Sequence, residues 1–154
     1  MRYARIMLAL LACAAALCAA DPFVGTWKMN LAKSKYKAGA PPKEQIATIT
    51  VTGSDMTVRV DAINADGRKT VVSYTIPYEG GMGKMSETSP AYDGISGKHI
   101  GPYEREISRW KDGKAVFTAR SVVSADGNSM LTSSKGVSPQ GTPVDASIVY
   151  DKIK

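Results

Sequence analysis

Alternating apolar and polar side chains characterise most of the chain after residue 22. Along residues 56–62, for example, Met56, Val58 and Val60 alternate with polar residues. Alternation with a period of two is typical of a β-strand that has one buried and one solvated face. No segment shows a strong 3.6-residue period of the kind that marks an amphipathic helix. The pattern therefore predicts an all-β protein.

Turn sequences separate the alternating stretches. Residues 64–67 (Asn-Ala-Asp-Gly) and 112–113 (Asp-Gly) are typical hairpin connections. Two segments are harder to interpret: 31–43 is a connection rich in Lys, Gly and Pro, and the Gly-rich 79–102 is either a long loop or irregular strands. Strands are expected at residues 23–30, 45–52, 56–62, 72–78, 94–100, 103–111, 115–124, 129–135 and 144–152.

The order of these strands predicts the architecture. Successive hairpins without helical crossovers form an antiparallel up-and-down meander of about eight to ten strands. A meander of this length closes into a barrel, because closure removes the exposed edge strands. We therefore expect a single β-barrel domain with little or no helix after its first 20 residues.

The beginning of the chain has the three parts of a secretory signal. Met1–Arg5 is basic, Ile6–Leu17 is apolar, and small residues precede the polar start at Asp21. The apolar run is too short to cross a bilayer, which takes about 20 residues. We predict a signal peptide over 1–20 and a barrel domain over 21–154, in a periplasmic or extracellular protein without a transmembrane segment. The alternative is a lipid anchor on Cys13.

Composition limits the chemistry of the predicted domain. Both cysteines, Cys13 and Cys18, lie in the predicted signal, and His99 is the only histidine, so neither a metal site nor a cofactor is expected. Loss of Arg2 and Arg5 with the signal lowers the formal net charge from +6 to +4, and no basic run predicts a nucleic-acid partner. Without a nucleophile–base arrangement, we expect a protein that is not an enzyme.

The first predicted strand carries a family resemblance. Gly25-Thr26-Trp27 resembles the Gly-x-Trp motif on the first strand of lipocalin and calycin barrels. With residues 31–36 and the late hairpins, most of 21–154 resembles a family of small exported bacterial lipocalin-like proteins of poorly known function. The resemblance implies that Trp27 plugs one barrel end and that Gly25 lets the chain bend there. Two lipocalin features are missing: an arginine late in the chain, since none follows Arg120, and a helix after the barrel.

The strand 103–111 carries the candidate anion-binding residues. Arg105 and Arg109 share one face with Ile107, and Trp110 is on the other. If Ile107 points inward, both arginines line the interior, where a guanidinium can hold a carboxylate through two hydrogen bonds. If Trp110 points inward, both arginines are solvated. A third arrangement places Arg109 at the barrel mouth, reaching toward water.

Tyr74, Tyr78 and Tyr150 are the other candidate ligand contacts. They share predicted inner faces with aliphatic residues, a lining that suits either a small-molecule site or a filled core. The first hypothesis is a barrel that binds a small apolar or amphipathic ligand. The alternative is a filled barrel that acts as a protein- or envelope-binding accessory or inhibitor module through loops 31–43 and 79–102. Small inward residues would favour a cavity: Ala47, Ala62, Ala119, Thr132, Ser134 and Ala146.

Overall fold

A computed structural model describes residues 20–86 and 89–154. The predicted signal peptide and the alternative anchor at Cys13 lie outside the described residues. A short 3-10 helix, η1, covers Leu31–Lys33. The strands are β1 (Gly25–Met29), β2 (Lys35–Ala38), β3 (Glu44–Thr52), β4 (Asp55–Ile63), β5 (Lys69–Pro77), β6 (Gly80–Met82), β7 (Lys84–Met85), β8 (Gly94–Gly101), β9 (Glu104–Lys111), β10 (Lys114–Val123), β11 (Ser129–Val137) and β12 (Pro143–Lys152).

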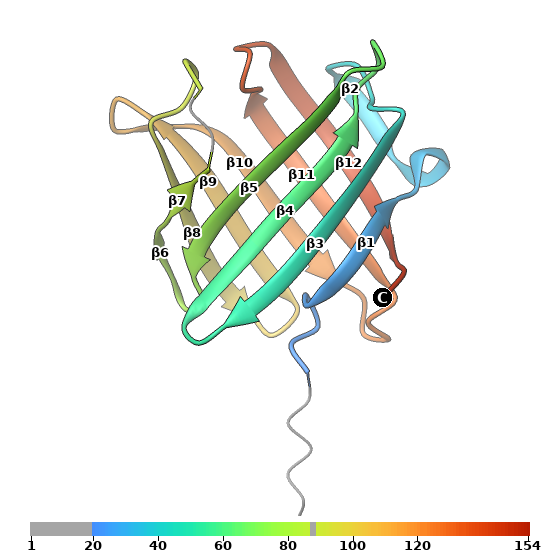
Figure 1. The fold of residues 1–154 in the computed structure, drawn as a ribbon, viewed down its shortest axis with the longest axis vertical. Helices are drawn as coiled ribbons and strands as arrows, with labels where there is room; N and C mark the ends of the chain where they lie inside the picture. The colour runs from blue at the N-terminus through green and yellow to red at the C-terminus, as the bar shows by residue number, and fades with distance from the viewer. Residues whose placement is uncertain (1–19, 87–88) are drawn as a thin grey trace, which may run out of the picture.

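The strands form one antiparallel sheet that curls into a nearly closed barrel (Figure 1). Most strands pair with their neighbours in sequence, as a meander requires. The first strand closes one side of the ring, because β1 lies between β12 and β3, with Met29 opposite Tyr150 and Gly25 opposite Ile49. The predicted fold class, an all-β antiparallel barrel with almost no helix, is confirmed.

The segment 80–85 closes the other side of the ring. Its first part, β6, pairs with β8, and its second part, β7, pairs with β5. The two flanking strands approach closely where Gly97 of β8 faces Ile76 of β5, since a Cβ on Gly97 would lie 2.5 Å from the Ile76 Cδ1. A larger residue at this position would push the seam apart. The Gly-rich segment thus contains short, irregular strands, which was one of the two expectations.

The structure adds detail to the predicted fold in two regions of the chain. The connection 31–43 is more ordered than predicted, because it contains η1 and the short strand β2, which pairs with β12. In β10, a bulge between Ala115 and Phe117 resets the alternation, so that Phe117 and Ala119 face the interior. Sequence alternation alone left this orientation open, because a bulge shifts every later side chain to the opposite face.

The chain enters the barrel at its lower end in Figure 1, where the Gly-x-Trp motif lies. Trp27 is fully buried, and its indole N–H donates to the Phe23 carbonyl at 2.8 Å. Gly25 has a φ of +143°, and a Cβ there would come within 2.4 Å of the Lys154 carbonyl oxygen. The Lys152 ammonium lies 5.0 Å from the Trp27 ring centroid, a cation–π contact.

Candidate functional site: a cavity inside the barrel

The barrel is hollow. Its interior holds a cavity of about 350 Å³ that extends to the upper end, where Ser138 and Pro139 of the β11–β12 turn line it. A volume in this range suits a small molecule. Most of the wall is apolar: Phe23, Ala47, Ile49, Met56, Val58, Val60, Val72, Ile76, Ile107, Phe117, Ala119, Met130, Val144, Ala146 and Ile148.

Small side chains on facing strands create this space. Ala47 of β3, Ala119 of β10 and Ala146 of β12 all line the cavity and are nearly fully buried. Thr132 and Ser134 of β11 also line it, whereas Ala62 does not. Larger residues such as Met56 and Met130 reach the interior without filling it, so the structure departs from the filled-barrel alternative.

Both candidate arginines lie on the cavity wall, on the same face of β9 as Ile107. Trp110 points to the outer side, where its indole N–H donates to the Ser96 hydroxyl at 2.9 Å. Arg105 and Arg109 are nearly equally buried, with 6% and 8% of their surface exposed. Their surroundings differ, and this difference decides which guanidinium is available to a ligand.

Arg105 is already bonded to other residues of the protein. Its Nη1 donates to the Tyr78 carbonyl at 2.8 Å, and its Nη2 lies 3.2 Å from the Asp21 carboxylate. Its guanidinium also packs on the rings of Tyr78 and Phe23, at 4.3 and 5.4 Å from their centroids. Arg105 therefore anchors the N-terminal segment across the lower end of the cavity.

Arg109 has no acidic partner within the described part of the chain. Its guanidinium is held between two aromatic rings, 4.9 Å from the Tyr92 centroid and 5.3 Å from that of Phe117. Its Nε, like that of Arg105, is buried and makes no hydrogen bond to residues 20–86 or 89–154. A buried cation without a counter-charge is costly in an apolar environment. Arg109 is thus a positioned cation on a largely apolar wall.

Two tyrosines add hydroxyl groups to the wall. Tyr74 of β5 and Tyr150 of β12 line the cavity, and their hydroxyls make no hydrogen bond within the described residues. Burial raises the pKa of Tyr74 to about 12, an effect opposed by the nearby charge of Arg109. Burial likewise raises the pKa of Tyr150, helped by the Tyr36 and Tyr74 phenols. Both phenols stay protonated at neutral pH and can donate a hydrogen bond into the cavity.

Tyr78, unlike the other candidate tyrosines, does not border the cavity. It follows Pro77, the last residue of β5, and its ring packs against the buried core and under the Arg105 guanidinium. Its hydroxyl donates to Asp21 Oδ2 at 2.5 Å, and this hydrogen bond, with burial, raises the Tyr78 pKa. Tyr78 therefore supports Arg105 at the lower end of the barrel.

Sequence reasoning missed three residues that shape the site. Asp21 neutralises Arg105, Tyr92 packs on Arg109, and Tyr36 contributes a third phenol to the cavity. Asp21 and Tyr92 precede regular strands and have no periodic neighbours, so no pattern indicated where they point. The alternation of Lys35-Tyr36-Lys37 was the available signal for Tyr36.

Hydrogen bonds join two segments across the upper end of the barrel. The Ser89 hydroxyl donates to the Pro139 carbonyl at 2.8 Å, and the Tyr92 hydroxyl donates to the Val137 carbonyl.

No metal site is apparent in the described part of the chain. Residues 20–86 and 89–154 bring together no group of three or more His, Cys, Asp or Glu side chains suited to a metal ion. The same residues contain no helix long and apolar enough to cross a membrane.

Comparison with known proteins gives matches among solved structures alone. No family model and no curated protein matches the chain. Zebrafish ileal bile acid-binding protein, solved with cholic acid, is 15% identical, with a TM-score of 0.49 over 86% of this chain and 99% of its own. The siderocalin Ex-FABP is 13% identical, with a TM-score of 0.39 over 86% of this chain and 71% of its own. Identities this low carry no information about function.

Proposed function

We propose that this protein is an exported carrier that encloses one small amphipathic acid in its barrel. The observation that carries the proposal is the apolar cavity of about 350 Å³ with the buried, uncompensated Arg109 on its wall. The signal-like residues 1–20 support the exported location. The ligand's apolar body would lie against the aliphatic wall, and its acidic group would meet the Arg109 guanidinium.

The size of the cavity narrows the ligand class. A volume of about 350 Å³ lies near the lower end of the range of small-molecule sites. It therefore suits a compact molecule, such as a medium-chain carboxylic acid.

Charge explains why an acid is favoured over a neutral molecule of the same shape. A carboxylate can accept two parallel hydrogen bonds from one guanidinium and neutralise it. Against the largely apolar wall such a pair is stronger than at the surface, and the rings of Tyr92 and Phe117 already hold the Arg109 side chain in place. Little side-chain entropy is therefore lost on binding.

Titration calorimetry with decanoate and 1-decanol tests this proposal. Decanoate is expected to bind at one molecule per chain, and Arg109→Met to weaken it by roughly 30-fold or more, as loss of a buried charged partner does. Decanol binding should change little. The matched control is Arg120→Met, which removes an exposed arginine paired with Glu104 and should leave both affinities unchanged. Equal losses for decanoate and decanol in Arg109→Met, or no binding at all, would contradict the proposal.

A further inference from the structure

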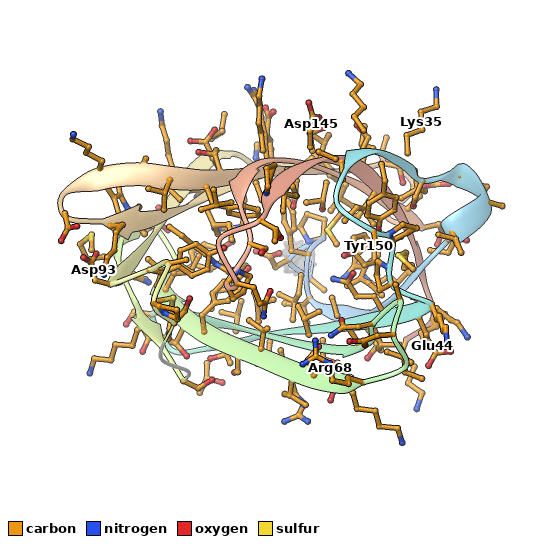
Figure 2. The ribbon with its side chains drawn as sticks, turned by 90° about the horizontal axis from the view of Figure 1, so that it is seen from above. Lys35, Glu44, Arg68, Asp93, Asp145 and Tyr150 are labelled. Atoms are coloured by element: carbon orange, nitrogen blue, oxygen red, sulfur yellow. The ribbon has the colours of Figure 1, made fainter. Side chains whose placement is uncertain are left out.

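A second polar position in the cavity, at Tyr150, lies apart from Arg109. Tyr150 is 4% exposed and belongs to the cavity wall, and Figure 2 shows it inside the ring of strands, whereas Lys35 and Asp145 point outward. Its hydroxyl has no hydrogen-bond partner among residues 20–86 and 89–154. Buried tyrosine hydroxyls usually find such a partner.

The strand register separates Tyr150 from Arg109. The ladder runs from Arg109 through Phe117 and Gly136 to Val144 of β12, three strands away at about 4.8 Å per step. Tyr150 then lies further along β12, about 20 Å below Val144 at ~3.4 Å per residue. Because both side chains point inward, the guanidinium and the phenol face different parts of one cavity.

The wall between these two positions is mostly apolar. Val58, Ile76 and Ala119 line the cavity and present no hydrogen-bonding group, and the Ser134 hydroxyl is the one cavity-lining polar group on the β11 ladder between the levels of Arg109 and Thr132. The Ser121 and Thr132 hydroxyls, which also line it, are bonded to each other at 2.8 Å. A ligand that fills this space therefore meets a cation, then a mostly apolar stretch, then a hydrogen-bond donor.

From this arrangement we infer that the ligand is polar at both ends: an acid whose far end carries a hydrogen-bond acceptor, such as a hydroxyl or carbonyl oxygen, that takes the proton of the Tyr150 hydroxyl. The inference rests on the proposed function and names its ligand class more closely. The site distinguishes an acid with a terminal oxygen from a plain alkyl acid, because only the former offers an acceptor to the Tyr150 hydroxyl on the cavity wall.

Of the three phenols in the cavity, Tyr150 fits this role best. The Tyr36 hydroxyl already donates to the Met29 sulfur at 3.2 Å. Tyr74 lies within electrostatic range of both Arg109 and Tyr150, so its hydroxyl does not mark the end of the cavity away from the arginine. Tyr150 interacts with the other two phenols, not with the arginine. Tyr74→Phe is therefore a matched control for Tyr150→Phe, since both remove one hydroxyl from the same cavity.

The test compares alkyl carboxylates of roughly eight to twelve carbons with the same acids bearing a hydroxyl on the terminal carbon. In the unmodified protein, the hydroxy acid of the best-fitting length should bind about 5-fold tighter than its parent. Tyr150→Phe should abolish or reverse this preference and leave the plain acid's affinity nearly unchanged, whereas Tyr74→Phe should preserve the preference. Thermal unfolding of each variant reports whether it remains folded.

Failure of this inference is distinguishable from failure of the proposed function. Suppose that plain acids bind in an Arg109-dependent way, but that hydroxy acids bind no tighter than their parents, or still bind tighter in Tyr150→Phe. The carrier proposal then stands and the inference is wrong. Loss of the preference in Tyr74→Phe alone also overturns the assignment to Tyr150. If no acid binds at any length, the proposed function fails first.

Discussion

The two buried arginines of β9 should respond differently to the same substitution. Arg105 and Arg109 are four residues apart and nearly equally buried, but Asp21 neutralises Arg105 alone. Arg105→Met breaks a buried ion pair and leaves the carboxylate of Asp21, whose side chain is 12% exposed, without its cation. Breaking such a pair by removing one partner costs about 3–5 kcal/mol.

Arg109→Met should have a much smaller effect on stability. Each arginine has a buried Nε without a hydrogen bond to described residues, and each guanidinium contacts two aromatic rings. These contributions are therefore common to both substitutions. Only Arg105→Met also breaks an ion pair, so the two variants should differ in free energy of unfolding by about 3–5 kcal/mol.

Urea denaturation of the purified protein, followed by the fluorescence of Trp27 and Trp110, measures both changes. The slope of the unfolding free energy with urea should stay constant, which shows that the same surface unfolds in each variant. For a domain of this size, Arg105→Met should lower Tm by roughly 10 °C or more. Equal destabilisation by the two substitutions would refute the reasoning, because it would mean that the protein itself compensates Arg109 as fully as Arg105.

Three further predictions concern the cavity and the seam. Ala119→Leu places extra methyl groups in the cavity, so it should weaken decanoate binding by roughly 10-fold or more and change unfolding by less than about 1.5 kcal/mol, as calorimetry and urea denaturation measure. Gly97→Val places a side chain against Ile76 and should lower the free energy of unfolding by about 1–3 kcal/mol, and the double variant Gly97→Val/Ile76→Ala should recover part of this loss. An unchanged stability of Gly97→Val would contradict the close approach of β5 and β8 at this position. Because the pKa of Tyr74 is raised to about 12, folding protects its proton above pH 10, so the contribution of Tyr74 to stability should be full below pH 10 and fall by about 2 kcal/mol between pH 10 and 12, in addition to the losses from the other buried tyrosines. The stability of Tyr74→Phe should decline less steeply between pH 10 and 12. An identical decline in the two proteins would argue against the raised pKa of Tyr74.

The β architecture was predictable because its signals are local. Alternation placed Met56 and Val58 on the inner face of β4, and hairpin turns such as 112–113 set the antiparallel order. The same parity argument, applied to residues 103–111, offered inward arginines as one of its alternatives. The bulge in β10 was not predictable, because it depends on how Phe117 fits against Gly136 and Arg109 across two ladders.

The partners of the arginines could not be predicted from the sequence. Asp21 is 84 residues away from Arg105 along the chain, and no spacing rule connects them. Likewise, Tyr92 reaches Arg109 from a segment without regular alternation. Sequence reasoning treated the two arginines as equivalent, whereas long-range contacts commit one to the protein and leave the other facing the cavity.

Native mass spectrometry of the protein purified from its own host tests the central claim most directly. The account predicts a folded species that carries one additional mass of a few hundred daltons, as expected for a small molecule in a cavity of about 350 Å³. That mass should leave on denaturation and behave as an acid after solvent extraction. A folded protein without bound mass, which also takes up neither decanoate nor its hydroxy derivative, would contradict the account.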